Sequence, residues 1–250
     1  MTRKHKILIL FLILLVVVPN FIEAQQSVPK VTLGVQGSED PKDFVLSMKI
    51  VALLTILGLA PSILIMMTSF TRIIVVFHFL RTALATRSTP PNQILIGLAL
   101  FITFFVMKPV FSEINSEAIQ PYINDNIEQK TALNRAKKPV KKFMLDQTRQ
   151  KDLQLFVNLR GEGAPANPSE LTLSTIIPSF VISELKTAFQ IGFLLYMPML
   201  MIDLIIASIL LSMGMMMLPP MMISMPLKLL LFVLVDGWNL LVESLVQGFI

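Results

Sequence analysis

The 250-residue chain contains no cysteine and little else that could carry out covalent chemistry. Without cysteine there are no disulfides, no thiolate metal ligands and no thiol nucleophile. Only His5 and His78 could supply an imidazole, and we find no glycine-rich phosphate loop, paired carboxylates or Ser/His/Asp set. The sequence therefore argues against an enzyme, and it indicates neither a cofactor nor a resident metal ion.

Charged residues are also scarce. They make up 15% of the chain, whereas a soluble domain has about 25%. Hydrophobic residues make up 54%, and the mean hydropathy is +0.72. Together with several long apolar runs, this composition is typical of an integral membrane protein that contacts membrane lipid. The net charge of +5 is spread thinly along the chain, so we expect no nucleic-acid partner.

Residues 1–24 have the pattern of a secretory signal peptide. Three basic residues precede an apolar core at 7–18, which is too short to span a bilayer comfortably, and Ala24 supplies a small residue at the cleavage point. We expect cleavage after this residue, with an uncleaved N-terminal anchor as the alternative. Residues 25–44 are polar and broken by proline and glycine, which predicts an irregular exported stretch.

The remaining chain predicts an all-α fold with about four long apolar helices and a small helical soluble insert. We expect residues 45–112 to form a first helical hairpin, 113–187 the insert, and 188–250 a second hairpin. If the N-terminus is exported, an even number of crossings places the insert in the periplasm. The apolar run 45–80 is either one long helix or two pieces kinked at Pro61.

The second hairpin contains a methionine-rich bend. Ten of the 16 methionines lie within 197–225, and Gly214, Pro219 and Pro220 predict a break in the helix there. Three methionines are consecutive in this break: Met215, Met216 and Met217. Because methionine is flexible and polarizable, they could form a deformable collar that seals a pore. Ordinary core or lipid-facing packing is an equal alternative, and a thioether metal site is a third.

Two charges lie deep in the apolar segments on either side of this bend. Asp203 lies eleven residues before Gly214, and Lys228 lies eight after Pro220. At about 1.5 Å per residue, their depths differ by about 4–5 Å, which a lysine side chain can bridge. Because an isolated charge in a bilayer costs roughly 2.5–3.5 kcal/mol, we predict a pair across the hairpin or between copies. It is either a static salt bridge or part of a proton relay.

Three further charges need partners or water. Glu184 and Lys186 are two residues apart at the start of an apolar run, so on a helix they point to different faces and should not pair. Each serves either as an interfacial anchor or in a contact with another residue. Arg72 interrupts an apolar face, and we expect it to face protein or water rather than lipid.

Six motifs in one order carry a resemblance to a known family. They are MMTSFTRIIVV (66–76), TPPNQILIGLALFITFFVM (89–107), SELKTAFQIGF (183–193), IDLIIAS (202–208), MGMMMLPP (213–220) and FVLVDGW (232–238). Together they resemble the FliP family of flagellar export-gate proteins and its virulence-system relatives. The resemblance covers most of residues 45–247 and is weakest around 113–170.

The resemblance implies a core subunit of the type III protein export gate. Such a subunit forms a homo-oligomer, expected to be pentameric, with FliQ and FliR, and works with other export-apparatus proteins on unfolded exported polypeptides. Its location is the bacterial inner membrane at the flagellar basal body, with the complex largely on the periplasmic side. The alternatives are a virulence-type export-gate subunit and a small-solute channel, and the latter would need a polar lining along one helix face.

The resemblance also assigns roles to individual residues. Residues 215, 216 and 217 match the gating loop of the family, which favours the collar interpretation. Asp203 and Lys228 match charged positions that stabilise assembly, which favours the structural bridge over the relay, and Glu184 is expected to belong to the same intersubunit group. The signal peptide resembles the flagellar branch of the family.

Overall fold

The computed structural model describes residues 41–86, 88–161, 168–215 and 217–249. Within these ranges the regular elements are helices and there is no strand, so the expected all-α class is confirmed. The expected signal peptide and most of the exported stretch lie outside the described residues. The chain divides into two units, Met1–Leu54 and Thr55–Ile250, and every contact discussed below lies in the second.

The first apolar run forms two helices, α2 (Pro41–Met66) and α3 (Phe70–Ala83). Helix α2 continues through Pro61, so the division occurs at residues 67–69 rather than at the proline. Thr68 stabilises the break, because its hydroxyl donates to the carbonyl of Ile65 (2.7 Å) and accepts from the Phe70 N–H (3.3 Å). Such local side-chain bonds compete with helix continuation.

The second run forms α4, and a helical insert follows it. The elements are α4 (Asn92–Ile114), a π-helical turn (Asn115–Ile119), α5 (Gln120–Ile123), α6 (Gln129–Gln147), α7 (Gln150–Arg160) and a short 3₁₀ turn (Pro168–Glu170). The insert has its own small core, in which Met144 of α6 and Val157 of α7 pack with Ile176 and Phe180 of the next helix.

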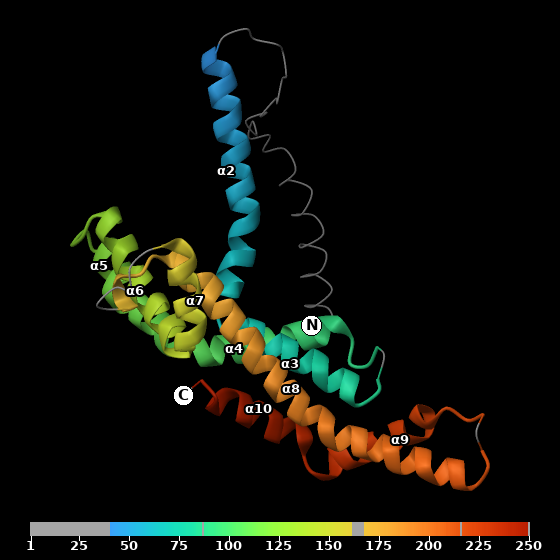
Figure 1. The fold of residues 1–250 in the computed structure, drawn as a ribbon. Coiled ribbons are helices and arrows are strands. Elements are labelled where there is room, and N and C mark those ends of the chain that lie inside the picture. The colour runs from blue at the N-terminus through green and yellow to red at the C-terminus, as the bar shows by residue number, and fades with distance from the viewer. Residues whose placement is uncertain (1–40, 87, 162–167, 216, 250) are drawn as a thin grey trace, which may run out of the picture. The chain divides into compact units, whose positions relative to one another are not determined.

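Helix α8 (Leu173–Ser212) has 40 residues and is about 60 Å long at 1.5 Å per residue. It packs against α6 and α7 near its start, against α3 in its middle and against α9 near its end (Figure 1). The boundary expected at residue 187, between insert and second hairpin, therefore falls inside one continuous helix. The first part of this helix belongs to the insert, and the rest belongs to the hairpin.

The last run is bent rather than straight. Helices α9 (Pro220–Leu234) and α10 (Gly237–Gln247) meet at 64°. Asp236 adopts a left-handed conformation (φ 51°), which aspartate tolerates better than most residues. A Cβ on Gly237 would lie 2.3 Å from Cε2 of Phe232, so any larger residue there would force this ring to move.

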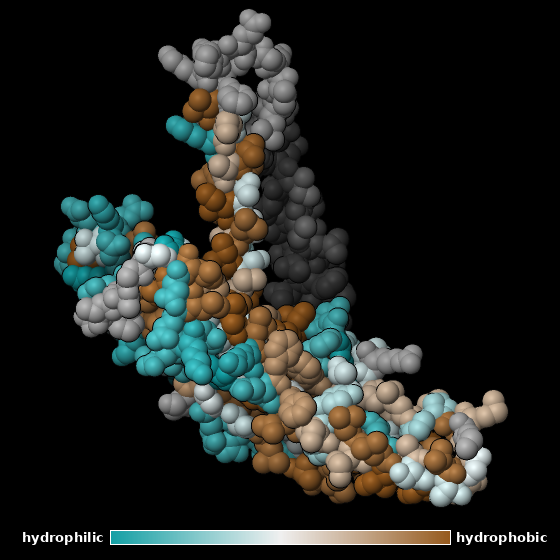
Figure 2. Space-filling model, in the orientation of Figure 1, coloured by the Kyte–Doolittle hydropathy of each residue, from teal (hydrophilic) through white to brown (hydrophobic). Residues whose placement is uncertain are grey.

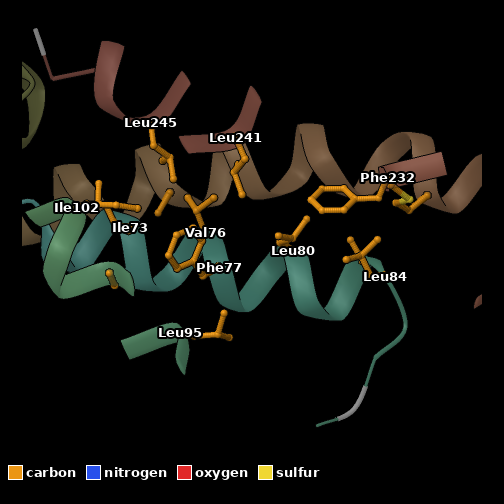
Figure 3. Packing of buried hydrophobic residues seen from close by; sticks show 14 residues of the cluster. Ile73, Val76, Phe77, Leu80, Leu84, Leu95, Ile102, Phe232, Leu241 and Leu245 are labelled. Carbon is orange, nitrogen blue, oxygen red and sulfur yellow. The ribbon is translucent and has the colours of Figure 1, made fainter. Parts of the chain in front are cut away.

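Helix α3 lies at the centre of the main core. Its buried side chains meet residues from α4, α9 and α10: Ile73, Val76, Phe77 and Leu80 pack with Leu95, Ile102, Phe232, Leu241 and Leu245 (Figure 3). Helix α8 approaches α3 closely at Gly192, where a Cβ would lie 2.5 Å from Cγ of Phe79. This glycine allows the two helices to pack together.

In the part of the chain that the structure describes, three helical segments are long and apolar enough to cross a membrane: Ser47–Met66, Asn92–Ile123 and Leu173–Ser212. The bent pair α9 and α10 could form a fourth span. This agrees with the expected number of about four. Figure 2 shows hydrophilic side chains gathered over α5–α7, whereas much of the surface over α8 and α9 is hydrophobic.

Candidate functional site

The methionine-rich bend is the loop that joins α8 to α9, residues 213–219. Gly214 has φ +74°. Its N–H donates to the carbonyl of Leu211 (3.1 Å), and the N–H of Met215 donates to the carbonyl of Leu210 (2.9 Å). This pair of bonds is a Schellman motif, which ends a helix with a glycine in the left-handed conformation. The predicted break is confirmed, and its glycine has a defined structural role.

The loop presents its methionines on the surface of the single chain. Met217 is 98% exposed and Met215 is 42% exposed. Met216 lies outside the described residues. The loop lies at the free end of the α8–α9 hairpin (Figure 1). Neither described methionine is a core residue of its own chain, so both can contact whatever lies beyond this end of the hairpin.

Below the loop, an ion pair joins the two helices of the hairpin. Lys228 Nζ donates to Asp203 Oδ2 at 2.6 Å, and the hydroxyl of Ser224 donates to Asp203 Oδ1. Lys228 is 2% exposed, whereas the side chain of Asp203 is 23% exposed. Both carboxylate oxygens therefore have a donor. Of the two predicted arrangements, the structure has the pair across the hairpin, within one chain.

A second ion pair lies at the crossing of α3 and α8. Arg72 Nε donates to Glu184 Oε2 at 2.8 Å, and its Nη2 donates to Oε1. Arg72 is 4% exposed and Glu184 is fully buried. A two-point contact of this kind is among the strongest geometries for an arginine and a carboxylate, because the planar guanidinium matches both oxygens.

Arg72 also contacts two other parts of the chain. Its Nη1 donates to the carbonyl of Gly248 (3.0 Å), and its Nη2 donates to Gln147 Oε1 at the end of α6 (3.1 Å). The ring of Phe249 stacks on the guanidinium, with Cζ 3.8 Å from the ring centroid. A single side chain thus joins α3, α6, α8 and the C-terminal segment.

The sequence predictions for these charges have different outcomes. Arg72 faces protein, as expected. Glu184 has its charge partner inside its own chain, and the expected role in contacts between subunits stays a prediction. Lys186 is exposed and does not pair with Glu184. The Arg72–Glu184 pair was not anticipated, because 112 residues separate its members and no local pattern links them.

The described residues contain no group of three or more His, Cys, Asp or Glu side chains that could hold a metal ion. His78 is exposed on α3, and its Nδ1 lies 3.2 Å from Arg81 Nη2. The chemistry of the candidate site therefore consists of buried ion pairs and apolar thioether side chains.

Comparison with known proteins identifies the family of the chain. The model of the FliP family matches residues 53–245. The flagellar biosynthetic protein FliP of Bacillus subtilis (strain 168) is 55% identical over 217 residues, covering 87% of this chain and 98% of that protein. The protein of the same name from Cereibacter sphaeroides is 51% identical over 219 residues (88% and 71%), and that of Aquifex aeolicus (strain VF5) is 50% identical over 205 residues (81% and 86%).

The matched region includes both ion pairs and the methionine loop. The match covers well over half of the chain, and the relatives align along most of their own length. The chain belongs to the FliP family, and it is a membrane-embedded component of the flagellar export apparatus.

Proposed function

We propose that this protein is a core subunit of the flagellar type III export gate and that its α8–α9 loop helps to seal the export channel. In this proposal several copies, expected to be five, assemble with FliQ and FliR in the bacterial inner membrane, with the complex largely on the periplasmic side. The channel passes unfolded flagellar proteins. The subunit has a structural role and carries out no covalent step.

The observation that carries the proposal is the exposed methionine loop at the free end of a hairpin whose two helices are joined by an ion pair. Met217 is 98% exposed, although a large apolar side chain gains by burial. In a ring of copies, residues 215–217 from each chain would contact one another and exclude water. Because methionine has three flexible torsions, such a seal would deform around a passing side chain of any shape.

The ion pair below the loop supports the proposal by holding the hairpin together. Asp203 lies eleven residues before Gly214, about 16 Å along the helix from the loop. The Schellman motif and this pair limit the motion of the backbone, while the methionine side chains remain free to adapt. We assign Asp203 and Lys228 to stabilising the hairpin for assembly. Glu184 remains a proposed member of the same intersubunit group, and its pair with Arg72 also stabilises the fold that presents the hairpin.

The alternatives from the sequence have weaker support. A small-solute channel needs a polar or charged lining along a helix face. In α9 the one charged side chain is Lys228, which is buried and paired with Asp203. The relatives named above are all flagellar, which favours the flagellar branch over a virulence-type gate.

Site-specific cross-linking to a stalled export substrate would test the proposal. A photoreactive amino acid replaces Met217, or Met215, in the full-length chain of motile cells. Phe101 on α4, which is 77% exposed, serves as the matched apolar control. We expect cross-links to the substrate from the loop positions and none from the control. An assembled complex whose loop positions never cross-link to the stalled substrate would contradict the proposal.

A further inference from the structure

The charged residues of the insert are separated by sign along the chain. Residues 109–128 contain four acidic residues and no basic one: Glu113, Glu117, Asp125 and Glu128. Residues 129–145 contain six basic residues and no acidic one: Lys130, Arg135, Lys137, Lys138, Lys141 and Lys142. The first set, from the end of α4 to the start of α6, is called the acidic edge below, and the second, on α6, the basic face.

The basic face covers the outer side of α6. At about 100° per residue, its six residues occupy about 160° of the helix circumference. The inward side chains Pro139, Val140 and Phe143 fall on the opposite side of the helix, where they are buried or pack against the core of the insert. Five of the six basic residues are exposed, and Figure 2 shows a hydrophilic surface over this part of the chain (Figure 2).

The acidic edge is also directed away from the rest of its own chain. All four of its acidic residues are exposed. The π-helical turn that carries Glu117 contacts α6, and its one buried residue is Ala118. Because Glu117 is exposed, its carboxylate points away from that contact. The acidic edge and the basic face are therefore two separate surfaces of one insert.

Neither surface is neutralised within the chain. None of these ten residues forms an ion pair with a described residue, and Lys141 donates to the carbonyl of Ser169 instead. Glu170 lies in the same hollow as Lys141, but it is a single acid beside several lysines.

Like charges also lie four positions apart on each surface: Glu113 with Glu117, and Lys138 with Lys142. Such pairs destabilise an isolated helix. A partner surface of the opposite sign would remove this repulsion.

We propose that the acidic edge of one copy binds the basic face of the next copy, so that neighbouring inserts contact each other head to tail. This inference rests on the proposed function, in which several copies assemble. A second copy is the partner that neutralises both surfaces at once, whereas a polyanion or a lipid surface would leave the acidic edge uncompensated. The contact needs no particular depth in a membrane, since both surfaces are hydrophilic.

The charges would set the direction in which the copies follow one another. The two surfaces differ, so the contact is heterologous, and repeated contacts of this kind form a ring when the rotation closes. Charge complementarity contributes mainly to specificity and orientation, because like charges brought together disfavour the wrong arrangement. Two acidic edges, or two basic faces, would repel each other.

The first test is disulfide cross-linking between two tagged versions of the full-length chain, one with Glu117→Cys and one with Lys138→Cys, expressed together with the other export-apparatus proteins. The chain has no cysteine of its own, so each version carries a single thiol. After mild oxidation we expect mixed dimers of the two versions and almost none from either version alone. Leu159→Cys, on α7 and 72% exposed, replaces Lys138→Cys in the matched control and should give no mixed dimer.

The second test reverses the charges. Glu113→Lys/Glu117→Lys and Lys137→Glu/Lys138→Glu should each lower the yield of assembled complex about tenfold, because like charges then meet across the contact. The variant that carries all four changes should recover most of the yield, which a merely misfolded insert could not do. Lys108→Glu/Lys151→Glu changes the net charge as much as the second variant, at exposed positions outside the basic face, and should keep the parental yield.

Three results would overturn the inference. Efficient dimers from either cysteine version alone would mean a symmetric contact. A lowered yield that the fourfold variant does not recover would assign the basic face to another anionic partner. An assembled complex without mixed dimers, whose methionine loop still cross-links to a stalled substrate, would refute the insert contact and leave the gate proposal intact. Failure of the parental chain to form any complex would instead contradict the proposed function, and this inference with it.

Discussion

Among the described residues, two ion pairs each have their acidic member on α8, and they differ in how many elements they join. Glu184 and Asp203 are both on α8, about 28 Å apart along its axis. Glu184 is fully buried, and its partner Arg72 also contacts α6 and the C-terminal segment. Asp203 is partly exposed and bonds only to side chains of α9, Ser224 and Lys228.

The difference divides α8 into two regions with different tasks. Around Glu184 the helix is held on several sides, by α3, α6 and α7, and by the tight fit of Gly192 against Phe79. Around Asp203 it is held by α9. The first region supports the fold of the single chain, while the second carries the loop that we propose as the gate. Substitutions in the two regions should therefore fail in different ways.

Breaking the pair at Arg72 should have the largest effect. Arg72→Ala leaves Glu184 as an uncompensated buried charge, which costs roughly 3–5 kcal/mol and is a large share of the roughly 5–15 kcal/mol of a typical domain. We expect little chain in the membrane and a strongly lowered apparent Tm of what remains. Arg72→Lys keeps the charge but loses the two-point contact, so it should lie in between. A membrane level and Tm equal to the parent's would contradict the multi-element role of Arg72.

Breaking the pair at Asp203 should affect assembly more than accumulation. Asp203→Ala leaves Lys228 buried and unpaired, and we expect a cost near the low end of roughly 3–5 kcal/mol, because the carboxylate is partly exposed. The yield of assembled complex and motility should fall while the chain still reaches the membrane.

The exchange Asp203→Lys/Lys228→Asp should recover part of this loss of complex yield and motility. Glu243→Ala, on an exposed part of α10, is the control and should change both very little. If Asp203→Ala leaves complex yield and motility intact, the pair does not stabilise the assembled state.

A single added methyl group should distinguish the two regions further. Gly192→Ala would force Phe79 to move, and overpacking of this kind typically costs 1–3 kcal/mol. Gly97→Ala on α4 is the matched control, since a Cβ there meets nothing within 4 Å and alanine favours helix by about 0.5–1 kcal/mol. We expect a lowered Tm for the first and an unchanged or raised Tm for the second. The opposite order would mean that α3 and α8 are less tightly packed than the structure indicates.

The sequence predicted those features that depend on local composition. Long apolar runs predicted the helices, and Gly214 with Pro219 and Pro220 predicted the loop. The Asp203–Lys228 pair could be inferred because the two residues lie at similar distances from that loop on adjacent helices. In a hairpin, two residues at similar distances from the turn, one on each helix, lie close together in space.

Features that depend on tertiary packing could not be predicted. Pro61, Pro109, Pro178 and Pro198 all lie inside helices, so proline alone did not mark the breaks. The actual breaks depend on a threonine side chain at 68 and on a left-handed aspartate at 236, which is followed by Gly237 against the ring of Phe232. The Arg72–Glu184 pair depends on the crossing of α3 and α8, which no pattern within either helix specifies.

The most direct test of the gate is the ion conductance of membranes that contain the assembled complex with Met215, Met216 and Met217 all replaced by alanine. The backbone of the loop depends on Gly214 and on the hairpin below it, so this variant should assemble while its seal loses side-chain volume. We predict a clear leak of ions or small solutes. Replacing the exposed helix methionines Met197, Met201 and Met222 by alanine is the matched control and should leave the membrane tight. An assembled loop variant as tight as the parent would contradict the account and place the seal elsewhere.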